Sequence, residues 1–174
     1  MILRFRQEGQ RNHAFNLIVR KYQERLYWHI RKMVISHDDA DDVIQNTFIK
    51  AFQGLERFRE DASLYTWLYR IATNETLSFL KKRKKRNYLP LGDYHEYLEK
   101  NLESDPYTDG DEIQMKLQKA IIRLPEKQRL VFNMKYFDEL KYEEISDVLG
   151  TSVGALKASY HHAIKKIEQY LSDD

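Results

Sequence analysis

Residues 140–167, LKYEEISDVLGTSVGALKASYHHAIKKI, decide the fold of the C-terminal part of the chain. Apolar residues recur every three or four positions from 142 to 149 and again from 153 onward, which predicts two amphipathic helices. Gly150 stands between them and supplies the left-handed backbone conformation that commonly ends a helix. Thr151 or Ser152 then caps the second helix. Helix, glycine-containing turn and helix in this order predict a helix-turn-helix motif.

The second helix of the motif is expected to present short or basic side chains to solvent. Leu156, Tyr160 and Ile167 face inward, and the outward residues are Ala155, Lys157, Ala158, His161, His162 and Lys165. Such side chains suit a helix that lies in the major groove of DNA. A plain helical hairpin is the alternative. The two histidines also suggest a metal site as an alternative, although adjacent residues point about 100° apart on a helix and rarely bind one ion together.

Upstream of this motif the apolar spacing is again helical. One stripe predicts a helix that ends near Met33, and a second predicts a helix that begins after Ser36, with Asp39 in a capping box, and ends near Gly54. Asp61 or Ser63 caps a third helix, which ends in the basic run 81–86. The apolar stripes are Phe15, Ile18, Tyr22, Leu26, Ile30 and Met33; Ala40, Ile44, Phe48 and Phe52; and Leu64, Trp67, Leu68 and Ile71.

Charge is distributed unevenly along the chain. Residues 1–90 carry 18 Lys and Arg against 10 Asp and Glu, whereas residues 91–112 carry one Lys and eight acids. The acidic segment contains Gly92, Pro106 and Gly110 and no evident apolar period, which favours a flexible linker. Helical spacing resumes over 113–174, with Pro125 at the start of a helix. The sequence therefore predicts an all-α chain with domains at 1–90 and 113–174 and a linker at 91–112.

Composition narrows the function classes. The 174 residues include no cysteine, so disulfides, zinc fingers and thiol catalysis are excluded. The first residues, MILRFRQEGQR, do not read as a signal peptide, and no apolar stretch approaches the roughly 20 residues that span a bilayer. We therefore expect a cytoplasmic protein without membrane insertion of its own. No phosphate loop, nucleophile–base pair or metal-ligand spacing indicates a cofactor or an enzyme.

Two stretches of the N-terminal half point to partners. DDADDVIQNTFIKAF, residues 38–52, places four carboxylates at a helix N-terminus, more than helix-dipole stabilisation alone explains, and this face suits a basic protein partner. A two-metal nuclease site is the alternative. Residues 58–86 interleave aromatic and basic side chains, a combination that holds unstacked bases along a phosphate backbone. Core packing is favoured for Trp67 and base stacking for Phe58.

Several motifs in order resemble one family. FNLIVRKY, DADDVIQNTFIKAF, FREDASLYTWLYRIATNE and, after the acidic linker, LPEKQRLVFNMKYFDELKYEEISDVLG are similar to the extracytoplasmic-function (ECF) group of sigma-70-type factors. The resemblance implies an alternative sigma factor that binds core RNA polymerase, recognises the −10 and −35 promoter elements and promotes strand opening. It also implies contacts with the β′ clamp helices and the β flap of the polymerase, and an anti-sigma factor as a further partner.

The resemblance also implies a role for individual residues. It assigns polymerase binding to Asp41, Asp42, Gln45, Asn46 and Phe48. The −10 element falls to Gly54, Phe58, Arg59, Asp61 and Asn74. Lys81, Lys82 and Arg83 of the neighbouring basic run are expected to contact the phosphates of the same DNA, and a solvated helix end is the alternative. The −35 element falls to Ser152, Lys157, Ala158, His161, His162 and Lys165.

One departure from the family pattern concerns the second helix of the motif. Ser159, His162 and Ile164 occupy positions at which arginine is common in the family, so bidentate arginine–guanine recognition is missing. We expect a different −35 sequence or weaker −35 recognition, with His162 as a main base contact. A free-standing helix-turn-helix regulator is the remaining alternative, and it would bind duplex DNA without polymerase.

Overall fold

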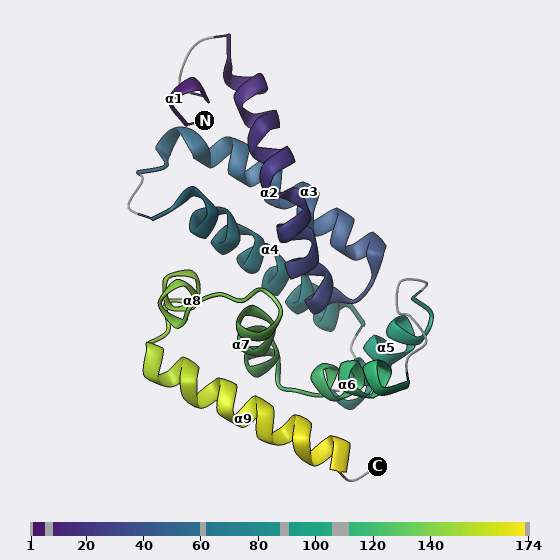
Figure 1. Ribbon diagram of the computed structural model, residues 1–174. Helices are drawn as coiled ribbons and strands as arrows, with labels where there is room; N and C mark the ends of the chain where they lie inside the picture. Colours follow the sequence, from purple (N-terminus) through teal and green to yellow (C-terminus); the bar gives the residue numbers. More distant parts are fainter. Residues whose placement is uncertain (1, 6–8, 60–61, 88–90, 106–111, 173–174) are drawn as a thin grey trace.

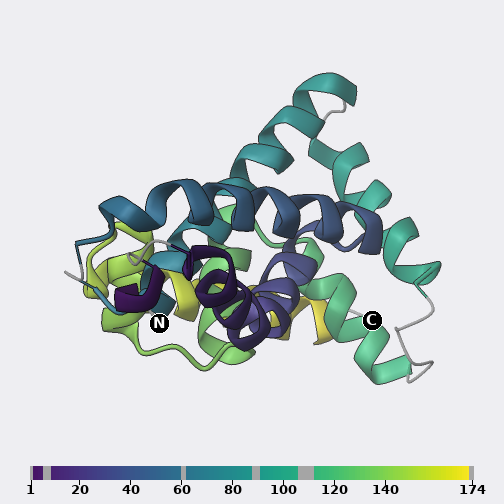
Figure 2. The same cartoon turned by 90° about the horizontal axis from the view of Figure 1, so that it is seen from above.

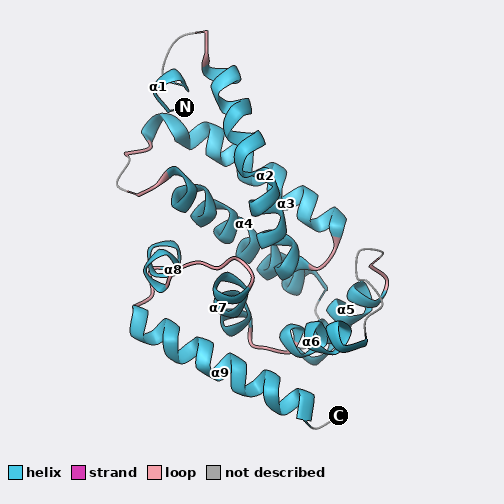
Figure 3. Cartoon of the chain, viewed as in Figure 1, coloured by secondary structure: helices cyan, strands magenta, loops and turns pink. Residues whose placement is uncertain are grey.

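The computed structural model describes residues 2–5, 9–59, 62–87, 91–105 and 112–172. Within these ranges the regular structure is helical and contains no strand (Figures 1 and 3). None of the described helices is long and apolar enough to cross a membrane. The prediction of an all-α chain is confirmed.

The N-terminal unit is built on three long helices. They are α2 (Arg11–Val34), α3 (His37–Gly54) and α4 (Leu64–Asn87), which pack against one another, with the short α1 (Ile2–Phe5) beside α2 and the 3₁₀ turn η1 (Leu55–Arg57) after α3. Leu26 and Ile30 of α2 and Leu68 of α4 are fully buried. The unit places the acidic start of α3 beside the basic end of α4.

Local signals set the helix boundaries as the sequence predicts. Ser36 caps α3, with its Oγ accepting the backbone N–H of Asp39, and Ser63 caps α4 by accepting the N–H of Thr66 at 3.0 Å. Asp61 itself lies outside the described residues. Between α2 and α3 the chain turns at Ile35, whose φ of 66° is unusual for a β-branched residue. The turn at Ile35 therefore allows α3 to fold back against α2.

The segment after α4 differs from the sequence prediction. Helix α5 (Leu91–Glu103) occupies residues that were expected to lack regular structure. Tyr94, Leu98 and Leu102 recur at four-residue intervals and are all buried. In Figure 2 the end of α4 and α5 form a helical hairpin that projects from the rest of the chain. The expectation of irregular backbone is thus wrong for 91–103.

The C-terminal unit contains the predicted helix-turn-helix. Its helices are α6 (Glu112–Ile122), α7 (Glu126–Tyr136), α8 (Tyr142–Leu149) and α9 (Val153–Ser172). Pro125 is the N-cap of α7, one residue before the position that the sequence predicted. Gly150 has the left-handed conformation expected of it, with φ of 65°, and ends α8. This turn sets the angle between α8 and α9.

The two units lie against each other. Helix α7 packs on α2, and α8 packs on α4, so that the C-terminal unit sits below the N-terminal one in Figure 1. One apolar cluster includes Ile30 of α2, Leu68 of α4, Met134 of α7 and Ile145 of α8. A smaller cluster, which includes Phe132, joins α7 to α6 and α9. The larger core is therefore shared between the units.

Candidate functional site

The outward face of α9 is the first candidate surface. Ser152 caps the helix, its Oγ accepting the N–H of Ala155 at 3.3 Å. Leu156, Ala163 and Ile167 are buried on the opposite side, which fixes the rotation of α9 about its axis. The residues that sequence analysis assigned to the −35 element are all exposed: Ser152, Lys157, Ala158, His161, His162 and Lys165.

This exposed row has the chemistry of a DNA-reading helix. Lys157 and Lys165 offer ammonium groups to phosphates, and the histidine rings can donate or accept hydrogen bonds at base edges. The rings of His161 and His162 are 6.1 Å apart and tilted by 54°, so they diverge. Across the residues that the structure describes, no group of three or more potential metal ligands occurs. The lysines and histidines of this row are thus suited to nucleic acid contact.

The start of α3 carries the second surface. Asp42, Gln45 and Asn46 are exposed, while Asp41 and Phe48 are half-buried. The sequence analysis assigned these five residues to polymerase binding, and the structure brings them onto one side of α3. Their carboxylates and amides form a negative, hydrogen-bonding strip that complements a basic partner.

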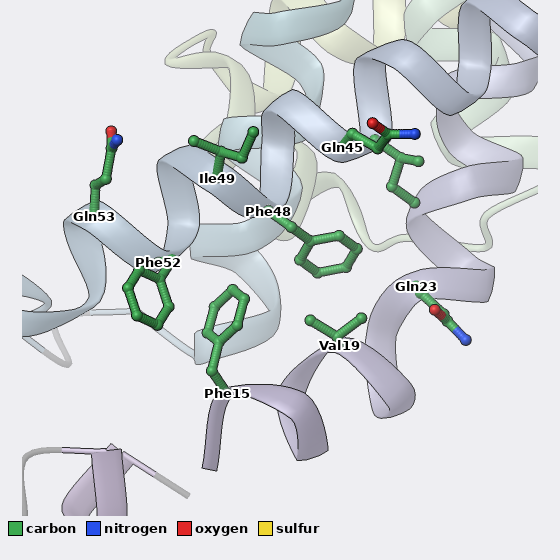
Figure 4. A pocket seen from close by; sticks show the side chains of 9 residues that line it. Phe15, Val19, Gln23, Gln45, Phe48, Ile49, Phe52 and Gln53 are labelled. Carbon is green, nitrogen blue, oxygen red and sulfur yellow. The ribbon is translucent and has the colours of Figure 1, made fainter. Parts of the chain in front are cut away.

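An apolar groove continues this strip along the same helix. It runs between α2 and α3, with Phe15 and Val19 on one wall and Phe48, Ile49 and Phe52 on the other (Figure 4). Phe15 packs edge-to-face on Phe52, with ring centroids 5.0 Å apart, and Ile49 remains 55% exposed. The glutamine side chains along its margin are Gln23, Gln45 and Gln53. A groove of this kind fits the apolar face of an amphipathic helix.

Of the groove residues, only Phe48 and Gln45 were predicted from the sequence to bind a partner. The buried residues of α3 are Ala40, Val43, Thr47 and Ala51, which are small, so the helix turns its small side chains to the core. The larger stripe through Phe48 and Phe52 is therefore left at the groove. The sequence of α3 did contain a signal for an external partner, because a stripe of large apolar residues runs beside its row of small ones.

The connector after α3 buries one of the residues assigned to the −10 element. Phe58, for which base stacking was favoured over core packing, is only 6% exposed, and its ring lies 5.1 Å from that of Trp67. The turn η1 causes this burial because it folds the connector back, with the N–H of Phe58 donating to the carbonyl of Leu55. A Cβ on Gly54 would lie 3.1 Å from the Trp67 ring. Gly54 and Phe58 thus lie against the Trp67 ring and support the connector from its inner side.

The other residues assigned to the −10 element are more accessible. Arg59, Asn74, Lys81 and Lys82 are exposed, and Asp61 lies outside the described residues. Asn74 and the two lysines belong to α4 and Arg59 to the connector before it. The exposed side chains provide cations and an amide, which suit a phosphate backbone and base edges.

Arg83 belongs to an internal contact. Its guanidinium pairs with the carboxylate of Asp39 and donates to the hydroxyl of Tyr97. Burial lowers the pKa of Arg83, but the hydrogen bond to Asp39 and the charge of that carboxylate outweigh it, so the pKa is raised. Arg83 therefore joins α4 to α3 and α5, while Lys81 and Lys82 remain exposed.

Comparison with protein families gives two matches. Residues 18–86 match the sigma-70 region 2 model, and residues 114–167 match the sigma-70 region 4 model. The ECF RNA polymerase sigma factor SigW of Bacillus subtilis is 31% identical over 168 residues, covering 92% of this chain and 90% of that protein. The RNA polymerase sigma-H factor of Pseudomonas aeruginosa is 35% identical, covering 91% of this chain and 86% of that protein.

Solved structures share the fold. CnrH, in complex with the cytosolic domain of CnrY, has a TM-score of 0.69 at 23% identity, covering 94% of this chain and 90% of that one. The sigma factor RpoE of Bartonella quintana, in complex with the anti-sigma factor NepR, has a TM-score of 0.70 at 21% identity, covering 92% of this chain and 98% of that one. The exposed helix-turn-helix face, the two family matches and the full-length relatives agree, and the chain belongs to the ECF family of sigma-70-type factors, which direct RNA polymerase to promoters.

Proposed function

We propose that this sigma factor binds core polymerase through the strip and groove of α3. Asp41, Asp42, Gln45 and Asn46 supply the polar part, and Phe48 joins it to the apolar groove. A basic, amphipathic helical partner such as the β′ clamp helices would satisfy both. The acidic part attracts and orients the partner, and burial of groove side chains such as Ile49 supplies affinity.

The two promoter elements are assigned to separate units. The α9 face binds the −35 element, and its exposed row of six expected residues is the single observation that carries the proposal. The −10 element is bound over the connector and α4 by Arg59, Asn74, Lys81 and Lys82. Gly54 and Phe58 support that surface through Trp67 instead of contacting a base in this conformation.

The division of labour leaves no chemical step to this chain. The polymerase forms the phosphodiester bonds, so the protein acts as a positioning factor, is not an enzyme and needs no cofactor. Its place of action is the cytoplasm, with the polymerase. Because two structural neighbours were solved with CnrY and with the anti-sigma factor NepR, we also propose that an anti-sigma factor regulates this chain.

In vitro transcription with core polymerase of the source organism tests the assignment. Promoter-specific transcripts should appear only when the chain is added, and His162→Ala should change the order of promoter preference. His13→Ala is the matched control, since His13 is also exposed but lies on α2. Tight duplex binding by the chain alone, with no transcript from any core enzyme, would identify a free-standing regulator instead.

A further inference from the structure

The contact between the two units contains a polar centre at Asp138. This residue follows α7, and its side chain is only 7% exposed. One carboxylate oxygen lies 3.0 Å from His29 Nδ1 and accepts the hydroxyl of Tyr69, and the other accepts Lys32 Nζ at 2.6 Å. His29 and Lys32 belong to α2 and Tyr69 to α4. Three donors of the N-terminal unit thus converge on one carboxylate of the C-terminal unit.

His29 is built into the N-terminal unit as a holder for that carboxylate. The ring is fully buried, and its Nε2 lies 2.9 Å from the hydroxyl of Thr73 on α4. Because an ionised carboxylate only accepts hydrogen bonds, Nδ1 carries the proton that faces Asp138. Thr73 therefore fixes the orientation of a ring whose other nitrogen has its partner on the C-terminal unit.

The backbone of the C-terminal unit aims Asp138 at this pocket. Its N–H donates to the carbonyl of Asn133 at 3.1 Å, and the next residue, Glu139, has a φ of 55°. A left-handed glutamate is uncommon and is kept only where its surroundings require it. The sharp turn directs Asp138 away from its own unit and into the other.

Further polar contacts surround this centre. The fully buried Arg129 of α7 donates to the carbonyl of Met33 at 3.1 Å, and Arg70 of α4 donates to the backbone carbonyl of Asp147 on α8. Lys84 of α4 pairs with Glu126 of α7 at 2.6 Å. Interfaces with many polar groups are typical of contacts that form and separate. These polar contacts, which lie beside the shared apolar cluster, therefore allow the units to separate when a partner compensates for exposure of that cluster.

Promoter geometry requires such opening. Elements named for positions 25 base pairs apart lie about 85 Å apart along B-form DNA, at about 3.4 Å per base pair. A compact chain of this length has a radius of gyration of only about 16 Å. In addition, α8 holds Arg70, which stands one helical turn before Asn74 on the same face of α4. The closed chain therefore cannot span both elements, and α8 lies one helical turn from Asn74, which itself stays exposed.

We propose that Asp138, held by His29, Lys32 and Tyr69, is a latch that keeps the free sigma factor closed and unable to engage both promoter elements. The role of this closure in initiation rests on the proposed function, whereas the latch itself does not. Opening breaks the contacts of Asp138 with its three donors, so that these groups hydrogen-bond to water, and it exposes apolar side chains such as Met134. Binding of core polymerase to both units is the event that offsets this loss.

The latch is tested in the free protein by distance measurement. The chain has no cysteine, so Ser78→Cys on α4 and Gln169→Cys on α9, both exposed, accept a pair of spin labels. Pulsed dipolar spectroscopy should give one narrow distance distribution, which Asp138→Ala converts into a broad one at longer distances. Asp147→Asn is the matched control for Asp138→Asn, because only its backbone carbonyl takes part in the contact.

Each outcome of this measurement decides the proposal. A narrow distribution unchanged in both Asp138→Ala and Asp138→Asn would overturn it, as would a broad distribution in the unmodified sequence. If Asp138→Ala fails to fold by circular dichroism, Asp138→Asn supplies the result, since it keeps the shape and removes the charge. None of these readings depends on whether the chain initiates transcription.

A reversible lock tests the consequence for function. Arg70→Cys and Asp147→Cys stand on either side of the contact and can be joined by a short bismaleimide that contains a disulfide. The locked chain should lose nearly all promoter-dependent transcription, and reductant should restore it to the level of the unlinked double variant. Equal activity of locked and reduced chains would contradict the requirement for opening, and absence of activity in both would instead count against the proposed function.

Discussion

The carboxylate of Asp138 lies 3.0 Å from Nδ1 of His29, a fully buried ring 109 positions earlier in the chain. The contact joins the loop after α7 to the middle of α2 and is completed by Lys32 and Tyr69. The hydroxyl of Tyr69 has a raised pKa, chiefly because it is buried and also because Asp138 is nearby, so it stays protonated and donates. The polar centre of the contact between the two units therefore depends on the ionised form of Asp138.

The first prediction concerns the stability of the folded chain at acid pH. Burial raises the pKa of Asp138, but the hydrogen bond and charge of His29, together with Lys32, outweigh burial and lower the pKa from 3.8 to about 2. A depressed carboxyl pKa stabilises the folded chain above about pH 4, and this stabilisation is lost as the pH falls towards 2. The contribution is about 2 kcal/mol near neutral pH.

Urea unfolding between pH 2.5 and 7 measures this contribution. Asp138→Asn should lower the free energy of unfolding at pH 7, and the gap to the unmodified chain should narrow steadily below pH 4. Asp147→Asn should follow the unmodified chain throughout, because its side chain is exposed. A gap that stays constant with pH would show that the aspartate contributes shape and no charge.

Sequence patterns predicted the parts of the fold that depend on near neighbours. Gly150 and Ser152 mark the turn between α8 and α9, and Ser36 marks the start of α3, because a left-handed residue or a cap acts within three or four positions. The exposed row of α9 follows from the same periodicity. Local hydrogen bonding and helical spacing were sufficient for the helix-turn-helix and its outward face.

The parts that sequence reasoning missed depend on distant partners. Helix α5 was hidden by the acids of its segment, yet Glu103 pairs with Lys119 of α6 and Glu99 with Arg123, the residue directly after α6. The burial of Phe58 depends on Trp67, across the connector. No local pattern distinguishes Asp138 from any other aspartate after a helix. Such roles become visible only when the elements are assembled.

A second prediction addresses Phe58. If the ring is a core residue beneath the connector, Phe58→Leu keeps most of the buried apolar volume and should retain strand opening, while Phe58→Ala should lose roughly 3 kcal/mol of stability. Permanganate footprinting of the promoter measures opening, and urea unfolding measures stability. Loss of opening in Phe58→Leu at unchanged stability would restore the aromatic ring to a base-stacking role.

A third prediction addresses the groove on α3. Ile49 is 55% exposed and lines the groove, so Ile49→Asn should leave the unfolding free energy within about 0.5 kcal/mol. Binding to core polymerase should weaken at least about tenfold, equivalent to about 1.4 kcal/mol. Leu171→Asn is the matched control, since Leu171 is 42% exposed at the far end of α9. Fluorescence anisotropy with labelled sigma factor gives both affinities, and equal weakening by the two changes would argue against a specific groove partner.

The last prediction concerns base recognition by α9. His162 is exposed on the outward face, where its imidazole lacks the two-pronged donor geometry that recognises guanine. His162→Arg should therefore create a preference for guanine at one −35 position, worth about 1–3 kcal/mol, or roughly 5- to 150-fold. Transcription from a promoter library randomised over the −35 element measures this preference. His13→Arg is the control, because it adds the same charge on α2. A cation distant from the bases can contact only phosphate, so this change should raise the affinity for every sequence equally or leave the affinity unchanged. If His162→Arg likewise changes affinity without any change in sequence preference, the side chain at this position faces the DNA backbone and another residue of the α9 row reads the −35 bases.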